Sequence, residues 1–176
     1  HVSRNRLAEL AEQGREVHMV CQDIARGEPD YWSKHEWLQP YVSSFTKFIK
    51  DFDFEPQACE LAVESKKYGY RGRLDLFGTV KAGKGRRIVL VELKRSQSSA
   101  KWHLLQTAAY AAALTESVGS RNGGHGIERW AVYLLPDGTY RKQEHTDPLD
   151  FSYFTAALTT ARLREEWGLV SEKDER

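Results

Sequence analysis

Three charged residues, Asp75, Glu92 and Lys94, have the chemical types and the spacing to form a metal-dependent catalytic site. Glu92 and Lys94 end a strand expected over residues 87–94, so their side chains point to the same face, about 6.6 Å apart along the chain. The four apolar residues at 88–91 predict that this strand is buried on both faces, where charged groups need partners. Taken alone, however, an acid and a lysine at this spacing favour an ordinary ion pair at a strand end.

Asp75 supplies a second acid on the neighbouring strand, which is expected over residues 70–80. Aspartate is disfavoured inside strands, and here it is flanked by apolar residues. Two carboxylates on adjacent strands repel each other unless a cation lies between them, and Mg²⁺ takes carboxylates together with waters and substrate phosphate. With Glu92 and Lys94 added, the pattern predicts a Mg²⁺ or Mn²⁺ site. Gly72 allows a close backbone approach or a bulge beside it.

The helix expected over residues 100–116 carries a second group of candidates. Its apolar positions fall on one side of the helical wheel. The opposite side presents four polar or aromatic residues: Trp102, His103, Gln106 and Tyr110. A solvent-facing side usually carries Lys and Glu, whereas an indole, an imidazole, an amide and a phenol suit a phosphate backbone or a base face. The alternative, a helix packed on both sides, is nearly as good for Trp102 and weaker for Gln106 with Tyr110.

Periodicity and turn residues predict the elements that position these side chains. Helices are expected over residues 4–26, 40–52, 100–116 and 148–167. Strands are expected over residues 57–65, 70–80, 87–94, 129–135 and 139–143. Turns at 66–69 and 81–85 make the first three strands an antiparallel meander with a buried third strand. Ser98 or Ser99 is the expected cap of the third helix, and a Gly-rich loop over 119–126 follows it.

The order of these elements predicts a mixed α/β or α+β domain in which helices flank one sheet. At 176 residues the chain suits one domain over residues 1–176, with a flexible charged tail at 171–176. No apolar run approaches the roughly 20 residues of a membrane span. Since the chain begins with His1 rather than Met, we expect it to start inside its gene product, and a leader could precede it.

Charge and cysteine content narrow the class of protein further. The net charge is only +1, a weak argument against a large nucleic-acid interface, but the carboxylates of a metal site offset basic groups in this sum. Cys21 and Cys59 lie far apart without the spacing of a metal knuckle. Two free thiols in a reducing cytoplasm are therefore expected, and no iron–sulfur cluster.

Three short motifs follow one another along the chain: GxxD (Gly72 to Asp75), ExK (Glu92 to Lys94) and QxxxY (Gln106 to Tyr110). Together they resemble the RecB-type branch of the PD-(D/E)xK nuclease superfamily, which includes phage recombination exonucleases and CRISPR adaptation nucleases. The resemblance covers about residues 14–110. Leu74 stands where the name of the superfamily has Pro, at a position that varies in this branch. The resemblance implies a restriction-endonuclease-like core with a central mixed five-stranded sheet flanked by helices.

The resemblance also implies further ligands. The branch often has a metal-binding histidine on its first helix, which corresponds to His18; without the resemblance His18 would be a core histidine. An acid on the strand before GxxD corresponds best to Glu60, with Glu64 on the same strand face as the competitor. The backbone carbonyl of Leu93 would join the two acids of the metal site. Some relatives have a four-cysteine cluster that this sequence lacks, so no iron–sulfur cluster is carried over.

The implied activity is hydrolysis of DNA phosphodiester bonds by a Mg²⁺- or Mn²⁺-dependent nuclease. His18 favours an exonuclease acting on single- or double-stranded DNA ends. Asp75, Glu92 and Glu60 would serve the metal, while Lys94 would orient the attacking water or stabilise the developing charge. The candidate nucleic-acid contacts are Gln106, Tyr110, Arg15, Arg73, Arg71, Trp102 and His103.

Three alternatives stay open from the sequence. They are a catalytically silent nucleic-acid-binding module of the same fold, a metal-dependent phosphohydrolase for nucleotides or small phosphoesters, and a structural or interaction protein. The family setting implies a bacterial or phage-encoded protein of DNA recombination, repair or defence. An oligomer is also open, because some phage relatives form rings around DNA.

Overall fold

A computed structural model of the chain describes residues 4–28, 35–95, 100–118 and 126–169. Its centre is one five-stranded sheet in the order β1-β2-β3-β4-β5. The strands are β1 (Glu55–Ser65), β2 (Tyr70–Ala82), β3 (Gly85–Lys94), β4 (Glu128–Leu134) and β5 (Tyr140–Glu144). The expected cap at Ser98 or Ser99, most of the Gly-rich loop and the charged tail lie outside the described residues.

The sheet is mixed. β1, β2 and β3 form the predicted antiparallel meander, and β4 and β5 form a second antiparallel pair. β3 and β4 are parallel, and the helix between them in sequence makes the crossover that a parallel pair requires. The predicted mixed five-stranded sheet with flanking helices is therefore confirmed, and β3 lies at its centre.

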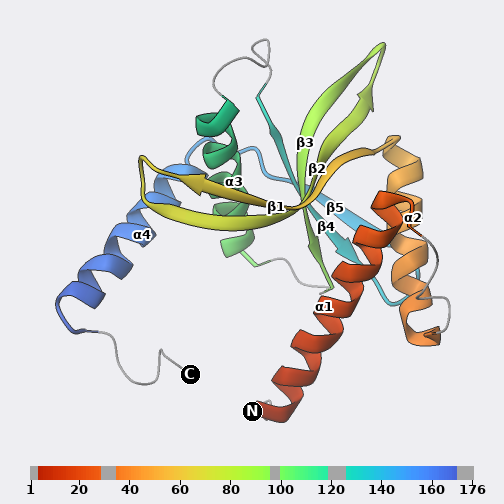
Figure 1. The fold of residues 1–176 in the computed structure, drawn as a ribbon, viewed down its shortest axis with the longest axis horizontal. Helices are drawn as coiled ribbons and strands as arrows, with labels where there is room; N and C mark the ends of the chain where they lie inside the picture. The colour runs from red at the N-terminus through yellow and green to blue at the C-terminus, as the bar shows by residue number, and fades with distance from the viewer. Residues whose placement is uncertain (1–3, 29–34, 96–99, 119–125, 170–176) are drawn as a thin grey trace.

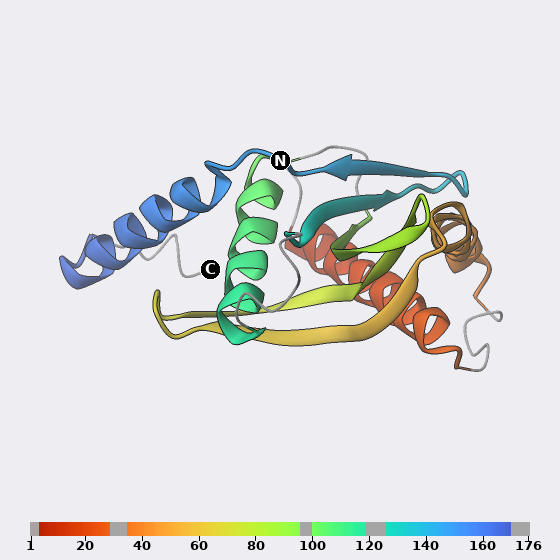
Figure 2. The same ribbon diagram turned by 90° about the horizontal axis from the view of Figure 1, so that it is seen from above.

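Helices cover both faces of this sheet (Figures 1 and 2). On one face lie α1 (Arg4–Arg26), the short 3-10 helix η2 (Glu36–Leu38) and α2 (Gln39–Phe52), and on the other lies α3 (Trp102–Val118). The last helix, α4 (Asp150–Glu166), packs beside α3 and extends away from the sheet. α1 agrees with its predicted bounds, and η2 was not predicted because three residues carry no periodicity. None of the helices in the described part of the chain is long and apolar enough to cross a bilayer.

Alternation along β3 assigns its side chains to two cores. Val89, Val91 and Leu93 pack into the larger core under α1 and α2, whereas Leu90 packs into the smaller core under α3. Residues two apart in a strand share a face, so Glu92 lies on the α3 side together with Leu90. The strand is buried on both faces, as its apolar run predicted.

Candidate metal centre

The β1–β2 hairpin twists out of the main sheet at Glu60 and Asp75. Leu76 packs in the core under α1 and α2, whereas Leu74, two residues earlier on β2, packs in the core under α3. In a regular strand these two side chains would share a face, so the strand rotates sharply between them. Glu60, on β1, has a φ of +52°, a left-handed conformation uncommon for residues other than glycine. The twist therefore coincides with the two acids.

β2 and β3 also separate at this level. Leu76 and Val91 form the last pair of their ladder, and beyond it the Leu93 N–H donates to Asp75 Oδ2 at 2.6 Å. The Asp75 carboxylate thus occupies the gap where the two strands diverge. Its residue is 8% exposed, so the carboxylate lies at the bottom of a cleft and not on the surface.

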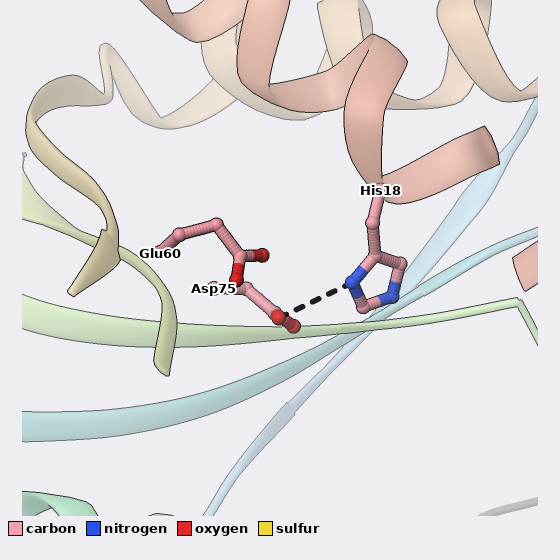
Figure 3. A group of neighbouring side chains, drawn as sticks. All are labelled: His18, Glu60 and Asp75. Atoms are coloured by element: carbon pink, nitrogen blue, oxygen red, sulfur yellow. Dashed lines mark ion pairs between the residues drawn. The ribbon is translucent and has the colours of Figure 1, made fainter. Parts of the chain in front are cut away.

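Three side chains from three elements meet in this cleft (Figure 3). His18 on α1, Glu60 on β1 and Asp75 on β2 each place one ligand atom within 4.8 Å of the others. His18 Nδ1 lies 3.2 Å from Asp75 Oδ1. Burial by itself would lower the pKa of His18, but the hydrogen bond and charge of Asp75, with the charge of Glu92, raise it above its ordinary value. The carboxylates around His18 thus favour a positive charge at this centre.

Glu92 is the most deeply buried acid of the site, at 3% exposed. Its Oε1 accepts hydrogen bonds from Lys94 Nζ and Gln106 Nε2, each at 2.8 Å. Its Oε2 is buried and has no hydrogen-bond partner among the described residues. Burial, followed by the charge of Asp75, raises the pKa of Glu92 to about 7. An unpaired buried carboxylate oxygen is costly, and a divalent cation would satisfy it, so this donor set fits an oxygen-preferring metal ion.

Gln106 connects the members of the ExK motif. Its Oε1 accepts from Lys94 Nζ at 3.2 Å, while its Nε2 donates to Glu92 Oε1 and to Tyr110 Oη, the latter at 3.0 Å. The structure therefore brings Gln106 and Tyr110 to the catalytic candidates, where they hold Lys94 and Glu92 in place. Direct contact of either side chain with nucleic acid remains a prediction.

The two other candidates on α3, Trp102 and His103, differ in their exposure. Trp102 is 55% exposed, and its ring centre lies 5.1 Å from Lys94 Nζ, so it is part of the site's surface. His103 is 4% exposed, and its Nδ1 lies 3.0 Å from Tyr133 Oη between α3 and β4. Burial lowers the pKa of His103 to about 4. His103 thus has its partner in the interior, at the Tyr133 hydroxyl, and its predicted contact with nucleic acid gains no support from this position.

The surroundings of Glu60 decide between the two candidate acids on β1. Glu60 lies in the cluster, where Gln22 Nε2 donates to its Oε1 at 2.8 Å and Arg73 Nη1 lies 3.8 Å from its Oε2. Glu64 lies outside the cluster and forms an exposed pair with Arg71, at 3.9 Å. The structure thus brings Glu60, and not Glu64, to the centre.

Gln22 and Met19, which were not predicted, line the cleft of about 490 Å³ that contains the cluster. Arg15 also lines this cleft and pairs with Glu12 on α1. Gln22 follows His18 by one helical turn, so the two side chains share a face. Extending the face of His18 by one turn would have found Gln22. The predicted role of the Leu93 carbonyl stays a prediction, although the Leu93 N–H contacts Asp75.

A comparison with protein families decides which group of proteins has this arrangement. The family model of the PD-(D/E)XK nuclease superfamily matches residues 2–170. The chain belongs to this superfamily. PD-(D/E)XK nucleases use divalent metals, in agreement with the cluster of His18, Glu60 and Asp75 that could hold one. The residues predicted to be the defining ones are Asp75, Glu92 and Lys94, with Leu74 in place of the proline. A search among curated proteins returned no match.

Proposed function

We propose that this PD-(D/E)XK protein is a Mg²⁺- or Mn²⁺-dependent deoxyribonuclease of the RecB-type branch that acts on DNA ends as an exonuclease. The observation that carries the metal-dependent chemistry is the buried Oε2 of Glu92 beside Asp75, which has no hydrogen-bond partner within the part of the chain that the structure describes. A site that keeps two carboxylates close together in the interior is suited to a cation, and less suited to a structural role.

Asp75 and Glu92 would be the principal ligands, and His18 and Glu60 would complete the site with the Leu93 carbonyl. When bound, the ion supplies a water of lowered pKa and a positive charge for the non-bridging oxygen of the phosphate. Glu60 is already held by Gln22, so its carboxylate needs little reorganisation to serve the site directly or through water.

Lys94 would act on the reacting atoms. Its Nζ lies between Glu92 Oε1 and Gln106 Oε1, and its side chain is 15% exposed, so its position is restrained before substrate binds. From there the ammonium would orient the attacking water or stabilise charge on the phosphate. Gln106 would hold Lys94 and Glu92 at a constant separation during this step.

The proposed action on DNA ends rests on His18 and on the order of the three motifs. His18 on α1 is the ligand that, in the RecB-type resemblance, goes with exonucleases. The order of the GxxD, ExK and QxxxY motifs, and the hydrogen bonds that join Asp75 to the Leu93 N–H and Gln106 to Glu92 and Tyr110, support membership of that branch.

Incubation of the protein with end-labelled linear DNA and with covalently closed circular DNA tests the proposal. Each substrate is incubated with Mg²⁺, Mn²⁺ or EDTA. Metal-dependent loss of linear DNA alone is the expected result, and the labelled-end pattern gives the polarity. Nicking of the circle would instead indicate an endonuclease. Binding of DNA without cleavage under either metal would favour the catalytically silent module.

A further inference from the structure

The outer face of the β1–β2 hairpin carries a row of arginines that leads away from the metal centre. Arg73 and Arg71 occupy alternate positions of β2, so their side chains share a face about 6.8 Å apart, and Arg73 lines the cleft together with Asp75. The side chains of Arg73 and Arg71 are 66% and 85% exposed. Neighbouring phosphates of a nucleic-acid strand are separated by a similar distance, so the row matches successive phosphates beyond the one at the metal.

The acids on β1 limit where such a strand could lie. Glu60 and Glu64 flank Arg73 and Arg71 at 3.8 and 3.9 Å, near the outer limit of an ion pair. Exposed pairs of this kind contribute little to stability, so a phosphate can replace the carboxylate as partner of each arginine. The same carboxylates repel phosphates over β1. The charge pattern therefore favours a path along β2.

The depth of the metal centre favours a single-stranded nucleic acid over a duplex as substrate. Asp75 and Glu92 are only 8% and 3% exposed, and Asp75 lies in the cleft between α1 and the hairpin. A duplex is a wide rod, and its paired partner strand would have to enter the cleft with the reacting phosphate. A single strand can bend into the cleft alone.

Exposed apolar side chains beside the cleft agree with unpaired bases. Met19 is 60% exposed on the α1 wall, and Trp102 is 55% exposed next to Lys94. Bases of a single strand stack readily on aromatic side chains, whereas paired bases keep these faces covered within the duplex. An exposed indole at a catalytic lysine therefore suits a single-stranded substrate.

We propose that the substrate is single-stranded DNA, or the unpaired end of a duplex, whose phosphates lie on Arg73 and Arg71 as the strand leaves the metal centre along β2. The inference rests on the proposed function, because it assigns the substrate of the same site.

Salt-dependent binding tests this path without requiring cleavage. The affinity for a labelled single-stranded oligonucleotide is measured in EDTA over a range of salt concentrations, for the wild type, Arg71→Gln, Arg73→Gln and the double variant. Each lost phosphate contact on a single strand reduces the slope of log K against log salt by about 0.7. We expect that reduction for each single variant and their sum for the double variant.

Lys84→Gln is the matched control, because Lys84 is an exposed cation in the turn at the opposite end of β2. Its slope should equal that of the wild type. A duplex of the same length whose two ends are closed by hairpin loops should bind more weakly than the single strand. Unchanged slopes for the two arginine variants, or equal binding of the closed duplex, would overturn the proposed path.

A parallel cleavage assay separates the two proposals. A reduced slope of log K against log salt in the arginine variants, together with no metal-dependent cleavage by the wild type, would support the strand path and contradict the nuclease function. Metal-dependent cleavage by the wild type, together with unchanged slopes in the arginine variants, would support the nuclease function and contradict the strand path. The absence of both binding and cleavage would overturn both.

Discussion

The ring of Tyr110 on α3 occupies the space beside Gly72 on β2: a Cβ atom on residue 72 would lie 2.3 Å from Tyr110 Cε1. The Tyr110 hydroxyl accepts a hydrogen bond from Gln106, which in turn binds Glu92 and Lys94. Gly72 of the GxxD motif therefore leaves room for Tyr110 of the QxxxY motif. Tyr110 in turn holds the Gln106 amide, which binds both charged residues of the ExK motif. The three motifs form one packed unit.

Gly72→Ala tests this relationship. The added methyl group overlaps the Tyr110 ring, so we expect a loss of about 1–3 kcal/mol in the free energy of unfolding. Displacement of Tyr110 should also release Gln106 and lower kcat. Urea unfolding and initial rates on DNA measure the two effects. Gly85→Ala is the control, because a Cβ atom on Gly85 meets nothing within 4 Å.

A compensating variant separates packing from positioning. Gly72→Ala combined with Tyr110→Leu should recover most of the stability, since the smaller side chain relieves the overlap, but kcat should stay low because Gln106 lacks its hydroxyl partner. Full recovery of kcat in the double variant would show that Tyr110 serves only packing.

Lys94→Ala should lower kcat by about 10²- to 10⁴-fold, the range expected for a group that moves or orients a proton at the reacting water. Asp75→Ala and Glu92→Ala should likewise abolish cleavage. The folded state should persist in each case, as judged by circular dichroism and thermal unfolding. Lys84→Ala provides a matched surface control. If the Lys94→Ala protein kept wild-type activity, the assignment of the ExK motif would be wrong.

Glu60→Gln should weaken Mn²⁺ binding roughly tenfold or more, the usual cost of losing an oxygen at or next to a metal. Glu64→Gln should leave the affinity unchanged, because Glu64 pairs with Arg71 outside the cluster. Isothermal titration calorimetry of the DNA-free protein measures both. The opposite order of the two affinities would show that Glu64, and not Glu60, serves the metal.

In the absence of metal, the ionisation of Glu92 should lower stability as the pH rises from about 4.5 to about 7, against the opposite contribution of His103 and His145, whose pKa values burial lowers to about 4. Burial and the charge of Asp75 raise the pKa of Glu92 from 4.5 to about 7 in the folded protein. Between these values the folded state retains a proton that the unfolded state has released, so ionisation of Glu92 progressively disfavours the fold. The raised pKa of His18 acts in the same direction, because its contribution is complete below pH 6.5 and is lost above its folded pKa. Urea unfolding in EDTA at several pH values measures this dependence.

Glu92→Gln should remove the Glu92 contribution, so the stability of the variant should rise more, or fall less, with pH than that of the wild type over the same range. Glu64→Gln, which removes an exposed acid, should retain the wild-type profile. Added Mn²⁺ should stabilise the wild type more at pH 8 than at pH 5, since the cation takes the place of the protons. A wild-type profile in the Glu92→Gln protein would assign the titration to another group.

Local pattern was enough to predict most of the fold. The helical stripe of α1 and the apolar run of β3 correspond to the observed elements, because burial imposes a period of 3.6 on a helix and continuous apolarity on a central strand. The parallel pairing of β3 with β4 follows from the helix between them. The strand ends differ by one or two residues, since the sheet continues into turns that carry no hydrophobic pattern.

The sequence by itself determined the chemistry of this protein: two acids and a lysine on neighbouring strands, with a glutamine and a tyrosine on the helix that follows. The tertiary structure alone decided that Glu60 lies at the centre and that His103 turns inward. The twist at Glu60 and the docking of α1 on the sheet set the distances among these side chains. Such distances join residues far apart in the chain, and no local periodicity encodes them.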